Sequence, residues 1–342
     1  ASGHFRVAKH RDKWWFVDPE GCLFWSHGID CVRFSATTSL AGREGHFEAL
    51  PEGFHGPQGI DFAQANQHAK YGVDWAANAI DLAHRRLRSW GMNTLGNWSD
   101  PQAYLKGRTP YVVAIHYSWN KEAVQGRIKD PEALRSALHK RLEQEQGKTS
   151  EDPWCIGYFV DNEIRWGRGM NAQAYYKLVR EEVKRVAPNK LYLGSRLHGH
   201  DAPHGSQPHL VAAAAKYCDV ISVNRYRFSP SDLRMLEGVD RPLIIGEFHF
   251  GALDRGMLHP GLRGLSNQAQ RAHAYEHYVT PALKHPHIVG PHWCQYREQN
   301  VTGRFDGENY QIGFVDICDT PYAEIVSASR RIGDRLYELR LE

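Results

Sequence analysis

The chain has 342 residues, 42% of them apolar and 24% charged, with a formal net charge of +3 at pH 7. This length suffices for one large α/β barrel or for two ordinary domains. The charge is too small to indicate a nucleic-acid partner, and no apolar run reaches the roughly eighteen residues that would span a membrane.

Short apolar runs alternate with amphipathic segments along the sequence. Near the start, residues 14–18 and 22–25 flank a Pro-Glu-Gly turn and predict a β-hairpin. We assign residues 1–22 to this N-terminal hairpin region and expect it to cap the bottom of the fold. Eight strands are then predicted, at residues 23–32, 93–98, 111–116, 155–163, 191–197, 220–226, 243–249 and 288–296. Helices are predicted at residues 74–90, 131–147, 171–186, 210–217, 266–284 and 320–341.

This alternation predicts a single (β/α)₈ TIM barrel that spans residues 1–342 as one catalytic domain. A doubly wound open sheet is the second fold to consider, but a nucleotide role there would need a Gly-rich phosphate turn after an early strand, and none is present. Two connections, residues 33–72 and 297–319, are unusually long. Because both follow strands, we expect them to lie over the catalytic face.

The cysteines do not indicate a metal centre. The six of them are scattered, and no pair has the Cys-x-x-Cys spacing of a zinc site. We expect most of them to be free and buried, since several fall inside predicted strands. The sequence therefore predicts no cofactor and no metal.

Two glutamates stand at the ends of buried strands. Glu163 closes the fourth predicted strand and Glu247 lies near the end of the seventh. The active site of a barrel forms where its strands end, so we expect the two carboxyl groups to share one cleft. An acid after an Asn on strand four and an acid on strand seven match the retaining glycosidases of the barrel clan called clan A, in which the carboxyl groups lie about 5–5.5 Å apart. We predict Glu163 as the acid/base and Glu247 as the nucleophile.

Other side chains at the strand ends are predicted to bind the substrate. Asn162 is expected to bond the 2-hydroxyl of the sugar, and Tyr226 to hold Glu247 ionised and aimed. Trp293 is expected to be the platform on which a sugar ring stacks. Further candidates for sugar contacts are Asn224, His249, Trp98, Trp166, Arg297 and Glu308.

A metal-dependent hydrolase is a possible alternative reading of the histidines. His116, His249 and His292 follow apolar runs and could, with Asp161, build a metal centre. Against this, the first strand carries no His-x-His pair, because His27 stands alone there.

Four segments resemble the β-agarases of glycoside hydrolase family 50. They are Trp-Trp-Phe-Val-Asp-Pro-Glu-Gly (14–21), Val-Asp-Asn-Glu-Ile-Arg-Trp-Gly (160–167), Ile-Gly-Glu-Phe-His-Phe-Gly-Ala-Leu-Asp-Arg-Gly-Met (245–257) and Gly-Glu-Asn-Tyr-Gln-Ile-Gly-Phe-Val-Asp-Ile-Cys-Asp-Thr-Pro-Tyr (307–322). The resemblance implies a clan A barrel that acts on chain ends, retains configuration and cuts β-1,4 linkages of agarose to release neoagarobiose. It places the acid/base on Glu163 and the nucleophile on Glu247.

The chain departs from this family in two respects. Family members commonly carry a carbohydrate-binding-like domain before the barrel, whereas we expect no separate domain of that kind here, so a loop or a second subunit would complete the cleft. Arg165 stands where a small residue is expected and, with Arg225, Arg227 and Arg297, suggests recognition of a sulfated galactan such as porphyran or carrageenan. A barrel that binds carbohydrate without catalysis is a further alternative. Family habit favours a periplasmic or secreted protein, and a homo-oligomer is left open.

Overall fold

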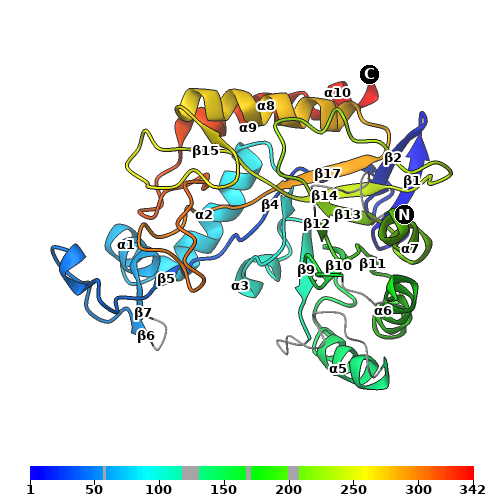
Figure 1. Ribbon diagram of the computed structural model, residues 1–342, viewed down its shortest axis with the longest axis horizontal. Coiled ribbons are helices and arrows are strands. Elements are labelled where there is room, and N and C mark those ends of the chain that lie inside the picture. The colour runs from blue at the N-terminus through cyan, green and yellow to red at the C-terminus, as the bar shows by residue number, and fades with distance from the viewer. Residues whose placement is uncertain (57–58, 118–130, 167–170, 199–207) are drawn as a thin grey trace.

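The computed structural model describes residues 1–56, 59–117, 131–166, 171–198 and 208–342 (Figure 1). Gly167, the last residue of the motif around Glu163, lies outside this range. A nine-stranded sheet forms the centre, in the order β11-β10-β9-β8-β4-β17-β14-β13-β12. All of its neighbouring strands run parallel. Its members are β4 (Gly28–Ile29), β8 (Thr94–Leu95), β9 (Tyr111–Ile115), β10 (Cys155–Val160), β11 (Leu191–Tyr192), β12 (Leu197–His198), β13 (Ile221–Asn224), β14 (Leu243–Phe248) and β17 (Ile288–Trp293).

Helices cover the outside of this curved sheet (Figure 1). They are α1 (Phe62–Tyr71), α2 (Trp75–Ser89), α3 (Pro101–Tyr104), α5 (Pro131–Glu143), α6 (Ala172–Val186), α7 (Pro208–Tyr217), α8 (Gln268–Lys284), α9 (Ala323–Asp334) and α10 (Leu336–Leu341). The side chain of Asn171 caps α6 by accepting from the backbone N–H of Ala174, and α6 buries Leu178 and Val183 at helical spacing. The predicted α/β class with parallel strands is confirmed, and the fold is barrel-like.

Two predicted strands are divided in the structure. The strand predicted at 23–32 is split, because β3 (Leu23–Phe24) pairs antiparallel with β2 (Lys13–Val17) while only β4 joins the central sheet. The strand predicted at 191–197 forms β11 and β12, with positive φ angles at Gly194 and Arg196 between them. The single helix predicted at 320–341 is likewise two helices, α9 and α10, that meet at Arg335.

The N-terminal residues form a small antiparallel sheet of β1 (Arg6–His10), β2 (Lys13–Val17) and β3. Phe5, Phe16 and Phe24 from this sheet are buried in one cluster with apolar residues at the amino ends of the central strands. These partners are Val112, Ile156, Leu191, Val220, Ile244 and Val289. The small sheet therefore covers the core at the end opposite the strand ends that carry Glu163 and Glu247.

The two long connections contact each other. The first holds β5 (Thr37–Thr38), η1 (Glu44–His46), β6 (His55–Gly56), β7 (Gly59–Asp61) and α1. Thr38 donates from Oγ1 to the carbonyl of Gly303 at 2.6 Å, and Tyr71 donates from its hydroxyl to Asp319 at 2.5 Å. Figure 1 shows the blue and orange segments side by side, away from the N-terminal sheet. The connection after β14 holds a short pair of strands, β15 (Gly251–Ala252) and β16 (Gly264–Leu265). No helix in the described residues is long and apolar enough to cross a membrane.

Candidate active site

The two glutamates lie at the carboxyl ends of β10 and β14, which are separated by four other strands in the central sheet. Glu247 is the fifth residue of β14 and is 7% exposed. Glu163 follows β10 in a turn where its own φ is +49° and that of Asp161 is +61°. The backbone N–H of Glu163 donates to the carbonyl of Ser195 at 3.1 Å, and Tyr117 and Tyr175 donate to the buried Asp161 at 2.9 and 2.6 Å. These bonds hold the turn that presents Glu163.

Asn224 joins the two carboxyl groups. Its Nδ2 lies 2.8 Å from Oε1 of Glu163 and 2.9 Å from Oε1 of Glu247. Both oxygens are within hydrogen-bond reach of one nitrogen, so they lie at most about 6 Å apart, which matches the spacing of a nucleophile and an acid/base and leaves too little room for the water of an inverting site. Asn162 lies beside them, with its Oδ1 at 3.3 Å from the same nitrogen.

The other bonds of Glu247 stabilise its ionised form. The hydroxyl of Tyr226 donates to Oε2, and Nη2 of Arg196 donates to Oε1 at 2.8 Å. Burial raises the pKa of Glu247 above the ordinary value of a glutamate, and the nearby Glu163 adds to this rise, whereas Arg196 and the Tyr226 bond lower it. Burial also raises the pKa of Tyr226 well above its usual range, so this hydroxyl stays a proton donor.

Sequence reasoning missed Arg196 and Asp30, which lie beneath Glu247. Both are fully buried, and Nη2 of Arg196 donates to Oδ2 of Asp30 at 2.8 Å. Nε of Arg196 also donates to Oδ1 of Asn224 at 3.2 Å, which sets the direction of the Asn224 amide. A signal was available, since each is a charged residue inside a predicted apolar strand, as the two glutamates are.

Trp98 lies next to this group. The Arg196 guanidinium sits over the Trp98 ring, 4.6 Å from its centroid, and the half-buried indole donates to Nε2 of His116 at 2.9 Å. Trp166 is half-buried and packs against Tyr175 and Tyr176. The role of either tryptophan in sugar binding stays a prediction.

The prediction that Trp293 is a sugar platform is wrong. Its side chain is fully buried, its indole N–H donates to the carbonyl of Ile312 at 2.8 Å, and its ring contacts Phe248 and Tyr275. A ring enclosed in this way has no face for a sugar. His249 is also buried, lies 4.6 Å from the Tyr226 ring and accepts from the backbone N–H of Leu262, so it supports Tyr226 from behind.

Arg225, Arg297 and Glu308 are engaged within the protein. Arg297, predicted to contact substrate, is buried and pairs with Asp319 at 3.0 Å, so its predicted direct contact is wrong. Arg225 pairs with Asp232 at 2.6 Å, and Arg165 and Arg227 are exposed. Glu308 pairs with Arg304 at 2.7 Å and accepts from Gln299 at 2.9 Å. The predicted role of Glu308 in sugar binding stays a prediction.

The candidate metal ligands are separated. His116 bonds Trp98, His249 bonds Leu262, and His292 contacts Ser26 at 2.8 Å. Across the described residues, no group of three or more His, Cys, Asp or Glu side chains is placed to hold a metal ion. All six cysteines are free: Cys31, Cys155 and Cys218 are buried, Cys294 is half-buried, and Cys22 and Cys318 are exposed.

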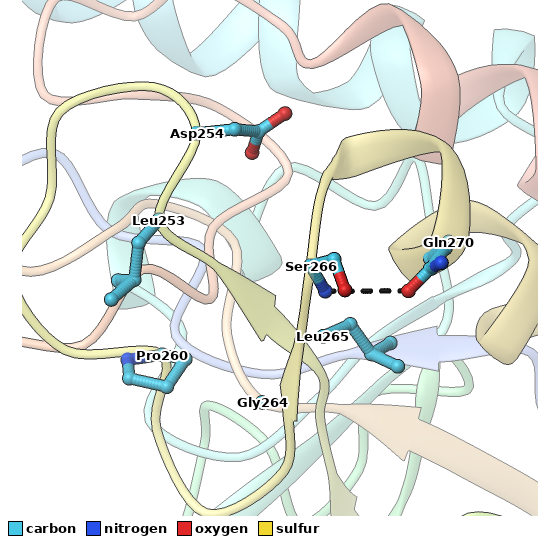
Figure 2. A pocket seen from close by; sticks show the side chains of 7 residues that line it. All are labelled: Leu253, Asp254, Pro260, Gly264, Leu265, Ser266 and Gln270. Atoms are coloured by element: carbon cyan, nitrogen blue, oxygen red, sulfur yellow. Dashed lines mark hydrogen bonds between the residues drawn. The ribbon is translucent and has the colours of Figure 1, made fainter.

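A separate surface depression of about 650 Å³ lies between β15, β16 and the start of α8 (Figure 2). Its lining residues are Leu253, Asp254, Pro260, Gly264, Leu265, Ser266 and Gln270. Figure 2 shows the bond from the backbone N–H of Ser266 to Gln270 at its edge. None of these residues bonds either glutamate, so the depression is distinct from the candidate active site.

The chain is similar to several β-agarases. The chain is 30% identical to β-agarase B of Vibrio sp. (strain JT0107) over an alignment that covers 99% of the chain and 49% of that protein. It matches the crystal structure of an agarase, AgWH50C, with a TM-score of 0.88 and 32% identity, covering 100% of the chain and 64% of that structure. It matches an exo-β-agarase structure with a TM-score of 0.86 and 26% identity, covering 100% and 66%.

The chain spans about half the length of the curated relatives it matches. No family model matches it.

Proposed function

We propose that this chain, which is homologous over its whole length to the β-agarases of glycoside hydrolase family 50, is a retaining exo-β-agarase. It hydrolyses β-1,4 linkages of agarose or its oligosaccharides and releases neoagarobiose. The observation that carries this proposal is the bridge that Asn224 makes between Glu163 and Glu247. The relatives are β-agarases, which supports the choice of polymer.

The reaction proceeds in two displacements at one carbon atom. A carboxylate oxygen of Glu247 attacks the anomeric carbon while the glycosidic bond breaks, and the leaving oxygen takes the proton of Glu163. Water then attacks the same carbon and gives a proton to Glu163, and the electron pair of the ester bond returns to Glu247. Tyr226 and Arg196 donate to the Glu247 carboxylate before it attacks, and Asn162, whose Oδ1 lies 3.3 Å from Nδ2 of Asn224, is expected to bond the 2-hydroxyl.

The proposal includes a closed eight-stranded barrel as the single domain of residues 1–342. In it, β11 and β12 are two parts of one fifth strand, which pairs with β10 at its start and with β13 at its end. The pairing of β17 with β4 supports closure at the other side. This frame gives Glu163 to strand four and Glu247 to strand seven.

An unsulfated galactan is the preferred substrate. The alternative of a sulfated galactan depended on arginines near the strand ends, and two of these, Arg225 and Arg297, are paired with Asp232 and Asp319. Because agarose lies outside the cell, we also propose that the protein acts outside the cytoplasm, which fractionation of the producing cells would test.

Product analysis on matched oligosaccharides of agarose, porphyran and carrageenan tests the proposal. We expect neoagarobiose from the agarose series, and Glu247→Gln as the negative control should release none. Turnover confined to porphyran or carrageenan oligosaccharides would overturn the choice of substrate. Binding without turnover on all three would instead indicate a carbohydrate-binding barrel.

A further inference from the structure

Arg196 lies between two carboxylates, of which only Glu247 takes part in the proposed reaction. Its Nη2 lies 2.8 Å from Oδ2 of Asp30, 2.8 Å from Oε1 of Glu247 and 2.7 Å from the carbonyl of Gly246. The side chains of Arg196 and Asp30 are both fully buried. This group of Asp30, Arg196 and Glu247 carries one more negative than positive charge when both acids are ionised.

The hydrogen-bond count in this group is unbalanced. Nη2 of Arg196 has two hydrogens and faces three oxygen acceptors, while Nη1 has no partner in the part of the chain that the structure describes. Asp30 is held independently of Arg196, because its Oδ1 accepts from the backbone N–H of Asn97 at 2.9 Å and lies 3.7 Å from Nδ1 of His292. Asp30 therefore keeps its position whether or not Arg196 bonds it.

We propose that Asp30 is a positioning residue that serves as the resident counter-ion of Arg196 when Glu247 loses its charge to the substrate. This inference rests on the proposed retaining mechanism, in which the Glu247 carboxylate becomes a neutral ester. An unpaired guanidinium buried in the protein is strongly unfavourable. With Asp30 present, the two hydrogens of Nη2 serve Asp30 and Gly246, and the covalent intermediate keeps a balanced ion pair.

The same arrangement governs the charge of Glu247 before reaction. Arg196 favours the carboxylate, and Asp30 opposes it by attracting the same guanidinium and by repelling a second negative charge. Asp30 therefore limits how strongly Arg196 stabilises the ionised form of Glu247. A nucleophile gives up its charge in the reaction, so excessive stabilisation of the carboxylate would slow it.

Several other ionisable groups lie close to Glu247, and their charges bear on a titration of that residue. They are Glu163 after β10, Tyr226 after β13, Cys31 after β4 and Cys294 after β17. Burial raises the pKa of Cys31 to about 11 and that of Cys294 well above its usual range, so both thiols stay neutral at working pH. Tyr226 also stays neutral. The charged groups that influence the titration of Glu247 are therefore Asp30, Arg196 and Glu163.

Titration of Glu247 by carbon-13 NMR tests the inference without substrate. The protein is labelled at the glutamate side-chain carboxyl carbons, and the Glu247 signal is identified by its loss in Glu247→Gln. We expect Asp30→Asn to lower the Glu247 midpoint by about one pH unit and Arg196→Gln to raise it by a similar amount. A purely structural role would not produce opposite shifts.

Asp319→Asn is the control, because it also removes a buried carboxylate that is paired with arginine, here Arg297 and Arg86, but contacts neither glutamate. We expect it to lower stability and to leave the Glu247 midpoint unchanged. An unchanged or raised Glu247 midpoint in Asp30→Asn would overturn the inference. This result is sufficient by itself, so the test holds even if Arg196→Gln does not fold. Failure of the wild-type protein to cleave agarose oligosaccharides would count against the proposed function alone, because the titration needs no substrate.

The kinetic counterpart is the value of kcat/KM on agarose oligosaccharides. We expect Asp30→Asn to reduce it about tenfold or more, with the acid limb of its pH profile moved to lower pH, because the intermediate then holds an unbalanced Arg196. A wild-type kcat/KM with an unmoved acid limb would contradict the role of Asp30.

Discussion

Glu163 and Glu247 accept hydrogen bonds from the same atom, Nδ2 of Asn224, at 2.8 and 2.9 Å. This nitrogen fixes how far apart the two carboxyl groups lie, and their separation determines whether a glycosidase retains or inverts configuration. Asn224 in turn is oriented by Arg196, and Asn224 and Glu247 are neighbours in the register of β13 and β14. The geometry of the pair is therefore set by the sheet itself.

Replacement of the two glutamates should have different consequences. Glu163→Gln should reduce kcat by about 10²–10⁴-fold, the usual contribution of a general acid. The loss should be much smaller for an aryl glycoside, whose leaving group needs no proton. Glu247→Ala should be inactive on both substrates and should regain turnover with azide, which enters from the side of the lost carboxylate and yields a product of inverted configuration. An exchange of these two patterns would reverse the assigned roles.

Tyr226→Phe should weaken catalysis while it leaves the fold intact. The hydroxyl donates to Oε2 of Glu247, and a hydrogen bond to a charged group contributes about 1.5–3 kcal/mol. We expect kcat/KM to fall about 10–100-fold. Steady-state kinetics with the thermal midpoint as a control measures this, and an unchanged kcat/KM would show that the bond does not act in the reaction.

Asn224→Asp should move the pH profile. A carboxylate at this position would face Glu163 and Glu247 at hydrogen-bond distance and disfavour the ionised form of Glu247. A nucleophile must be ionised, so activity would be lost at a higher pH than in the wild type, and the acid limb of kcat/KM should shift upward. The isosteric substitution keeps the volume constant. An unmoved acid limb would show that Asn224 does not sense the charge of the pair.

The position of the site could be predicted from the sequence because parallel strands bring their carboxyl ends to one edge. Glu163, Glu247, Asn224 and Tyr226 were predicted in this way, since each stands at the end of an apolar run, and the structure brings their side chains together. Asp30 and Arg196 also follow short apolar runs. The strands predicted around them are divided in the structure, so the sequence pattern did not show where each strand ends.

The direction of side chains was harder to predict. His292 points toward Ser26 inside the sheet, whereas its neighbour Trp293 packs against Tyr275 of α8. Adjacent residues of a strand face opposite sides, and a strand buried on both faces is apolar on both, so its pattern does not reveal which side faces the cleft. The pairing of Arg297 with Asp319 was also hidden, because the two residues stand at opposite ends of one irregular connection whose path the sequence pattern does not give.

Stability should fall as the pH drops below about 6.5. Burial lowers the pKa of His27 to about 4 and that of His249 to about 3. Between about pH 6.5 and 4 the unfolded chain binds protons at these sites that the folded chain does not, so unfolding is favoured as pH falls. For His27 the full effect is on the order of 3 kcal/mol.

Asp161 opposes this trend, because burial raises its pKa to about 6 and the folded state then holds a proton that the unfolded state has lost. Burial lowers the pKa of His285 to about 4 as well, whereas it raises the pKa values of Glu247 and Glu298, which act in the same direction as Asp161. We expect the three histidines to outweigh the three acids, which leaves a net loss of stability toward low pH. Thermal unfolding at pH 7 and pH 4.5 measures the sum. His27→Gln should be less stable at pH 7 but should lose less of its stability on acidification, and an equal loss would exclude His27 as a contributor.

The central claim, a double displacement by Glu247 and Glu163, is tested most directly by the anomeric form of the first product. Proton NMR recorded during rapid hydrolysis of agarose oligosaccharides distinguishes the two anomers before they equilibrate. We expect the β-anomer of the released sugar to appear first and the α-anomer to grow in later by mutarotation. Initial formation of the α-anomer would show inversion and would contradict the assignment of Glu247 as a nucleophile.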